Sequence, residues 1–72
     1  MKKEVALVKI GLKIKEMRIN QHLSQQDLAA ACNFEKSNMS RIEAGRSNLT
    51  IDTLLKICAA LNVKIIDIVN VE

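Results

Sequence analysis

The segment from residue 23 to residue 44 limits the possible folds most, because it holds two short helical patterns with only a tight turn between them. Ser24 is a preferred N-cap residue, and Asp27 stands three positions later, where its carboxylate can complete a capping box. Asn33 ends this first helix, and a second pattern runs from about Lys36 to Ala44. Two helices this short must cross at a steep angle to share one small core.

Apolar side chains recur at helical spacing through this segment, and nearly everything between them is polar. They are Leu28, Ala29, Cys32, Phe34, Met39 and Ile42. Ala29 supplies the small side chain that the crossing point needs, and Asn33 tolerates the positive φ that the turn requires. We therefore predict a helix-turn-helix core over residues 25–43.

The flanking segments are also helical in pattern. A first helix is expected from about Glu4 to Gln21. Gly45 ends the helix that begins near Lys36. Thr50 is the N-cap of a later helix that Asn62 stops. The expected buried stripe of this later helix is Ile51, Leu54, Leu55, Cys58 and Leu61.

The tail, residues 63–71, fits either a short fifth helix or a strand, because β-branched residues are dense in it. We favour the helix. Ile66, Val69 and Val71 exceed what so small a core can bury, and exposed apolar side chains of this kind mark interfaces. A homodimer is the favoured interpretation. The alternative is an antitoxin or another interaction module whose tail binds a partner protein.

Composition predicts one all-α domain spanning residues 1–72, since the chain has one aromatic residue, no proline and two glycines. Cys32 and Cys58 lack partners at metal-ligand spacing, so we expect buried free thiols and no metal or cofactor. The apolar run at residues 5–14 is too short and too interrupted for a signal peptide or a membrane span. A cytoplasmic location without a membrane partner is expected.

An enzymatic role is not expected. The single histidine, His22, lies at a predicted helix end, and no Cys–His or Ser–His–Asp spacing offers an activated nucleophile. No glycine-rich loop is present to hold a phosphate. The net charge of +3 is compatible with a polyanion partner but indicates one only weakly.

The polar face of the second short helix is suited to reading DNA. It carries Lys36, Ser37, Asn38, Ser40 and Arg41. Arginine binds guanine O6 and N7 through two hydrogen bonds, and serine and asparagine bond to several base edges. Because an α-helix fits the major groove of B-DNA, a protruding helix with this face favours base recognition.

The stretches Leu23–Ala29 and Met39–Arg46 resemble the phage repressor/Cro family of regulators, also called the xenobiotic-response-element type. The resemblance extends to residues 14–18 and 54–63 and covers about residues 10–69. It implies five helices, of which the second and third form the helix-turn-helix. It also implies a transcriptional regulator, most often a repressor, that binds palindromic double-stranded DNA as a homodimer.

By position, the resemblance assigns base contacts to Lys36, Ser37 and Arg41. The residues that it assigns to phosphates or the border of the groove are Ser24, Gln25, Asn38, Ser40, Arg46, Ser47 and Asn48. Binding to a phosphate at the start of the first short helix would be helped by the helix N-terminus.

Two structural expectations follow from the same resemblance. Arg18 and Glu43 occupy positions that pair in members of this family, so we expect a partly buried ion pair between the first and third helices. Glycine is usual in the family where this chain has His22, Asn33 and Asn62. We predict positive φ at all three, because histidine and asparagine tolerate left-handed backbone best among the other residues.

Overall fold

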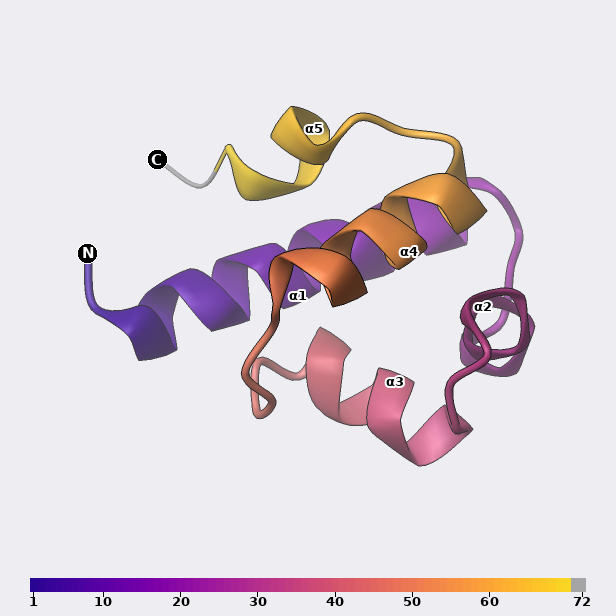
Figure 1. Ribbon diagram of the computed structural model, residues 1–72, viewed down its shortest axis with the longest axis horizontal. Coiled ribbons are helices and arrows are strands. Elements are labelled where there is room, and N and C mark those ends of the chain that lie inside the picture. The colour runs from indigo at the N-terminus through magenta and orange to yellow at the C-terminus, as the bar shows by residue number, and fades with distance from the viewer. Residues whose placement is uncertain (71–72) are drawn as a thin grey trace.

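Five α-helices and no strand make up residues 1–70, the part of the chain that the computed structural model describes. The helices are α1 (Lys3–Asn20), α2 (Gln25–Cys32), α3 (Lys36–Glu43), α4 (Ile51–Leu61) and α5 (Ile65–Val69). In Figure 1, α1 and α4 cross the middle of the molecule, with α5 on one side and the α2–α3 pair on the other. The predicted all-α fold is confirmed, and the ambiguous tail is a helix through Val69.

Side-chain caps set the starts of α2 and α4. The Ser24 hydroxyl accepts a hydrogen bond from the Asp27 N–H at 3.0 Å, and the Asp27 carboxylate accepts one from the Ser24 N–H at 2.9 Å. The Thr50 hydroxyl accepts from the Thr53 N–H at 3.1 Å. The predicted capping box and the predicted cap of α4 are therefore confirmed, since each satisfies N–H groups that the helix itself leaves unpaired.

Residues in the left-handed backbone conformation follow the ends of α1, α2, α3 and α4, as predicted. The φ angles of His22, Asn33 and Asn62 are 59°, 60° and 56°, and Gly45 has a φ of 74°. Asn33 and Asn62 are the C-caps of α2 and α4. Turn positions that usually take glycine are thus filled by residues that pay only a small steric penalty there.

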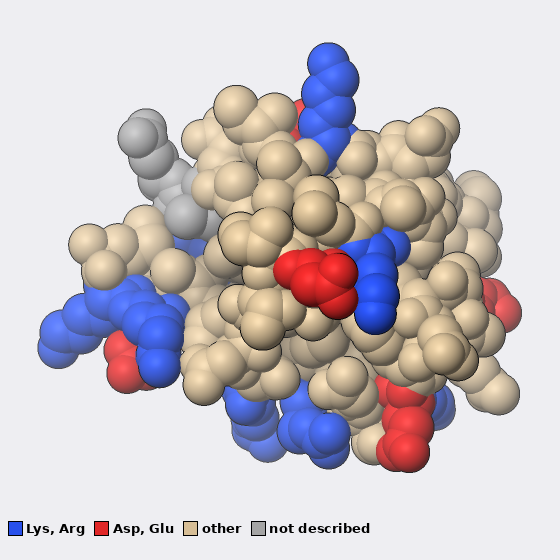
Figure 2. All heavy atoms as spheres, in the orientation of Figure 1, with Lys and Arg blue, Asp and Glu red and all other residues tan. Residues whose placement is uncertain are grey.

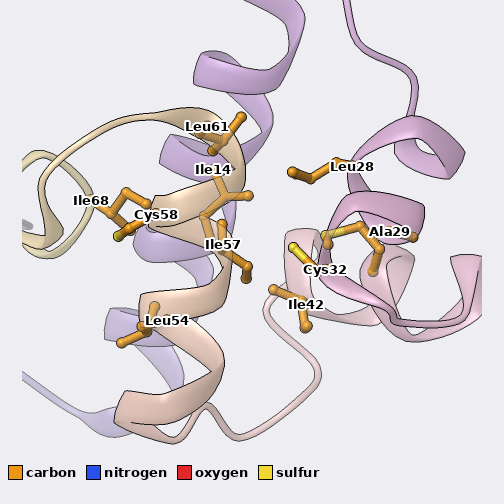
Figure 3. Packing of buried hydrophobic residues seen from close by; sticks show 11 residues of the cluster. Ile14, Leu28, Ala29, Cys32, Ile42, Leu54, Ile57, Cys58, Leu61 and Ile68 are labelled. Carbon is orange, nitrogen blue, oxygen red and sulfur yellow. The ribbon is translucent and has the colours of Figure 1, made fainter.

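All five helices contribute to one apolar core. Figure 3 shows Leu28 and Ile42, from α2 and α3, pointing toward Ile14 and Ile57 of α1 and α4. Ile68 of α5 closes the other side and is fully buried. These contacts give the chain its stability, because α2, α3, α4 and α5 are each too short to be stable as isolated helices in water.

Cys32 and Cys58 belong to the same core and are free thiols. Burial raises the pKa of both thiols above the ordinary value, and the nearby Asp67 carboxylate raises that of Cys58 further. Both side chains therefore stay protonated at neutral pH and pack as small apolar groups. This agrees with the expected buried free thiols.

The expected buried stripe of α4 is wrong at two positions. Ile51 and Leu55 are 64% and 52% exposed, whereas Ile57, which was not assigned to the core, is fully buried. The face that α4 turns toward α2 and α5 is formed by Leu54, Ile57, Cys58 and Leu61. Because apolar residues occupy nearly every side of α4, spacing alone did not determine which side faces inward.

The expected ion pair between Arg18 and Glu43 is present and more deeply buried than predicted. Nε and Nη2 of Arg18 donate to the two carboxylate oxygens of Glu43 at 2.7 and 3.0 Å. Nη1 of Arg18 donates to the Leu23 carbonyl at 2.7 Å. Arg18 and Glu43 are 8% and 5% exposed. One guanidinium thus joins the end of α1, the segment before α2 and the end of α3.

A glycine allows α1 to approach the end of α3 closely. A Cβ at Gly11 would lie 2.6 Å from the carbonyl oxygens of both Ile42 and Glu43. These are backbone atoms, so no side-chain rotation relieves the overlap. Gly11 was not identified from the sequence, although an isolated glycine within a helical pattern often has a packing reason.

We expect Arg18→Ala to lower the free energy of unfolding by about 3–5 kcal/mol, because it leaves the Glu43 carboxylate buried without its partner. Lys13→Ala is the matched control on the same helix. It breaks the exposed Lys13–Glu16 pair, whose N–O distance is 3.6 Å, and should cost about 0–1 kcal/mol. Urea unfolding of both variants measures the difference, and similar losses would contradict a structural role for the buried pair.

Gly11→Ala should destabilise the protein by about 1–3 kcal/mol through overpacking against α3. Helix propensity alone predicts the opposite sign, a gain of about 1 kcal/mol. Thermal unfolding followed by circular dichroism therefore distinguishes the two effects by sign. A higher midpoint temperature for the variant would show that α1 and α3 are not in close backbone contact at this point.

Candidate nucleic-acid interface

The helix-turn-helix is formed by α2, α3 and the three residues between them. Ala29 is 2% exposed, in agreement with the small side chain expected where the helices cross. The Phe34 N–H donates to the Ala29 carbonyl at 2.8 Å, which closes the end of α2 around the left-handed Asn33. The turn is therefore fixed by a backbone hydrogen bond and by the left-handed conformation of Asn33.

The two faces of α3 have separate roles. Met39 and Ile42 point into the core, and Glu43 pairs with Arg18. The outward residues are Lys36, Ser37, Ser40 and Arg41, with Asn38 half-buried at the edge. All three side chains expected to contact bases are thus exposed on one eight-residue helix. Figure 2 shows Lys and Arg atoms along the lower edge of the molecule, the edge at which α3 lies in Figure 1.

The start of α2 presents polar groups beside α3. Ser24 is exposed, and its hydroxyl keeps one rotatable hydrogen while it accepts the bond from Asp27. The Ser24 N–H, and then its hydroxyl, hold the pKa of the Asp27 carboxyl below its ordinary value. Asp27 therefore remains ionised and occupies the Ser24 N–H, so an incoming anion meets the next N–H groups of the helix instead.

Gln25 has a contact that the sequence did not reveal. Its Nε2 donates to Oε1 of Glu43 at 3.1 Å, and the residue is half-buried. The expected phosphate contact by this side chain therefore has only its remaining N–H and its amide oxygen available. Because the same oxygen of Glu43 also accepts from Arg18, Gln25 extends the buried ion pair to the start of α2.

The loop after α3 lies directly beyond the exposed polar face of this helix. Gly45 turns the chain, and the Arg46 N–H donates to the Arg41 carbonyl at 2.9 Å. Arg46 and Asn48 are exposed, whereas Ser47 is half-buried and its hydroxyl donates to the Asn48 carbonyl at 3.4 Å. Of the three loop residues assigned to the DNA backbone, two are therefore fully available to a ligand.

The three apolar tail residues have different environments. Ile66 is 63% exposed, whereas Val69 is half-buried and packs against the core. Val71 lies outside the described residues. Exposed apolar area at this end of the chain is therefore provided by Ile66.

Neither a metal centre nor a membrane span is indicated by the described residues. Between residues 1 and 70, no three His, Cys, Asp or Glu side chains gather as metal ligands. None of the helices in the same range is long and apolar enough to cross a bilayer.

Solved structures match this chain closely in fold. The restriction-modification controller protein C.AhdI from Aeromonas hydrophila superposes with a TM-score of 0.84 at 31% identity, over 86% of this chain and 94% of that chain. The wild-type controller protein C.Esp1396I gives a TM-score of 0.78 at 36% identity, over 82% of this chain and 76% of that chain. The clp gene regulator ClgR from Corynebacterium glutamicum, 22% identical, shares the fold with a TM-score of 0.84.

Sequence comparison points the same way. The control protein C.BamHI from Bacillus amyloliquefaciens is 33% identical over 61 residues, which cover 83% of this chain and 75% of that protein. The profile of the helix-turn-helix family HTH_3 matches residues 14–68. This match takes in α2 and α3, the turn between them and the Arg18–Glu43 pair. The chain therefore belongs to the helix-turn-helix family of Cro/C1-type DNA-binding transcription regulators.

Proposed function

We propose that this chain binds a palindromic operator in double-stranded DNA as a homodimer, with α3 of each protomer in the major groove. The observation that carries the proposal is the division of α3 into a buried apolar face and an exposed polar face. A helix anchored in this way presents its polar side chains at fixed positions, which recognition of base edges requires.

The base contacts are assigned to Lys36, Ser37 and Arg41. Ser37 and Arg41 are four residues apart and share one side of α3, and Lys36 opens the helix. Arg41 suits a guanine, since its guanidinium matches O6 and N7 together. Lys36 and Ser37 reach neighbouring base edges at the end of α3 that enters the groove first.

Phosphate contacts are assigned to both sides of the recognition helix. Ser24 and the first N–H groups of α2 meet one phosphate strand, with Gln25 contributing through its remaining amide groups. Arg46 and Asn48 meet the strand across the groove, and Ser47 contributes less because it is half-buried. Asn38 and Ser40 border the groove from α3. These contacts set the register without reading sequence.

The homodimer is proposed to form through exposed apolar residues of α4 and α5. A two-fold axis must place the two recognition helices about one DNA turn apart, ~34 Å. Ile66 is the exposed residue of the tail, and Ile51 and Leu55 add apolar area at the start of α4. In Figure 1, α4 begins at the loop that leaves α3, whereas α5 lies across the molecule from α3. A contact that includes α4 therefore keeps both α3 helices on one side of the dimer.

Repression is the proposed outcome of binding, because a dimer seated on promoter DNA excludes other proteins from the same site. The relatives named above are described as control proteins and gene regulators. These descriptions favour a DNA reader over the alternative of a toxin-binding module. A DNA reader also has an affinity that falls steeply with salt, since each neutralised phosphate releases counterions.

Arg41→Ala should weaken binding to the operator by about 1–3 kcal/mol and relax the preference at one base pair. Arg46→Ala is the matched control, because a phosphate contact weakens specific and random DNA alike. The measurement is fluorescence anisotropy on random DNA and on the operator recovered by selection from a random library.

Equal losses on both DNAs for Arg41→Ala would remove Arg41 from the base-reading set. If selection recovers no sequence, or recovers one without a palindrome, sequence-specific binding by a homodimer is wrong. The slope of log affinity against log salt should drop by about one unit for Arg46→Ala.

Leu55→Glu and Ile66→Glu should each shift the protein from dimer to monomer, because a carboxylate in an apolar interface is desolvated without a partner. Both residues are more than half exposed, so neither change disturbs the core. Sedimentation equilibrium measures the shift, with circular dichroism to verify the helices. A monomeric wild-type protein at high concentration, or two unchanged dimers, would contradict the proposed interface.

A further inference from the structure

Lys15 is a cation of α1 whose charge is not used within the fold. Its side chain is exposed, and among the described residues 1–70 it forms no ion pair. Lys13, two positions earlier, pairs instead with Glu16 at 3.6 Å. Two residues correspond to about 200° of rotation around a helix, so the two lysines lie on different sides of α1. The charge of Lys15 is therefore available to a ligand.

Lys15 lines a recess between three helices. The recess has a volume of about 290 Å³, and its polar lining residues are Lys15 of α1, Gln25 of α2, and Ser40 and Glu43 of α3. Gln25 and Ser40 are the residues already assigned to the DNA backbone and to the border of the major groove. The lysine of this recess thus lies beside the path proposed for a DNA strand.

The carboxylate of Glu43 is neutralised within the fold. Its two oxygens accept hydrogen bonds from Arg18 at 2.7 and 3.0 Å, and one of them also accepts from Gln25 at 3.1 Å. The guanidinium therefore offsets the negative charge at short range, which leaves the recess with the positive charge of Lys15. Gln25 keeps one amide N–H, and Ser40 has its hydroxyl, as neutral hydrogen-bond donors.

We propose that Lys15 binds one backbone phosphate of the DNA, in the recess where the strand passes between the start of α2 and α3. This inference rests on the proposed DNA-binding function and extends it to α1. A DNA strand alternates charged phosphates with deoxyribose rings, and proteins contact both groups to fix their register. The ammonium group of Lys15 suits the phosphate, and the apolar lining of the recess suits the carbon atoms of the sugar. The apolar lining residues are Val8, Leu12 and Ala44.

This contact ties the DNA backbone to the helix that positions α3. Lys15 stands three residues before Arg18 on α1, and Arg18 holds the end of α3 through Glu43. The phosphate and the end of α3 are thus held by neighbouring side chains of one helix. A phosphate contact of this kind sets the distance between the DNA strand and the exposed face of α3 without reading sequence.

The test compares Lys15→Gln with Lys13→Gln, which removes the same charge from another side of α1. Glutamine has nearly the helix propensity of lysine, so both variants should fold. Fluorescence anisotropy on random duplex DNA is measured over a range of salt concentrations. Lys15→Gln should lower the slope of log affinity against log salt by about one unit and weaken binding about five- to tenfold at ~0.1 M salt. Lys13→Gln should leave the slope unchanged, and Lys15→Arg should bind like the wild type.

Neutral methylphosphonates at single backbone positions of the selected operator locate the phosphate. One position in each half-site should weaken binding of the wild-type protein and leave the affinity of Lys15→Gln unchanged, because the variant has already lost this contact. No coupled position, or equal slopes for Lys15→Gln and Lys13→Gln, would overturn the proposal. A loss confined to the operator would also overturn it, since a phosphate contact acts on all sequences.

The failure of this contact is distinguishable from the failure of the proposed function. If the wild-type protein binds its operator and Lys15→Gln binds equally well, the contact is wrong and the proposed function stands. If the wild-type protein has no salt-dependent affinity for DNA, the proposed function is wrong and the contact with it.

Discussion

The buried pair of Arg18 and Glu43 is the interaction on which the position of α3 depends. Glu43 stands at the C-terminal end of α3, where the helix dipole disfavours a negative charge, so its burial requires a cation. Arg18 supplies that cation and also holds the Leu23 carbonyl, while Gln25 takes a further bond to Glu43. The ends of α1 and α3 and the start of α2 are thereby fixed by one polar cluster within an apolar core.

This cluster matters because α2 and α3 are each only eight residues long. A helix of that length is unstable in water without tertiary contacts. The helix α3, the proposed recognition helix, therefore obtains its shape from the core behind it and from the close approach of α1 at Gly11. Side chains that read DNA need this rigidity, since an ordered helix loses less conformational entropy on binding.

Features governed by neighbouring residues were predictable from the sequence. Distant contacts were not, apart from the Arg18–Glu43 pair, which the family resemblance indicated. The capping box at Ser24 and the left-handed turns at Asn33 and Asn62 depend on a few adjacent residues, and the structure has all of them. The inward face of α4 depends on how the helix is rotated against its neighbours. Because apolar residues lie on nearly every side of α4, its sequence is compatible with more than one buried face. The Gln25–Glu43 bond joins residues 18 positions apart and left no local signal.

The division of α3 into two faces has a consequence for how such a protein diversifies. Its stability is carried by Met39, Ile42 and Glu43, which point inward, whereas the proposed base contacts, Lys36, Ser37 and Arg41, point outward. Substitutions in the second group leave the core untouched, and exposed changes of this kind typically alter stability by less than about 0.5 kcal/mol. New binding preferences can thus arise through single substitutions, with each variant along the way still folded. Mutational drift at the outward positions is limited by the ligand alone.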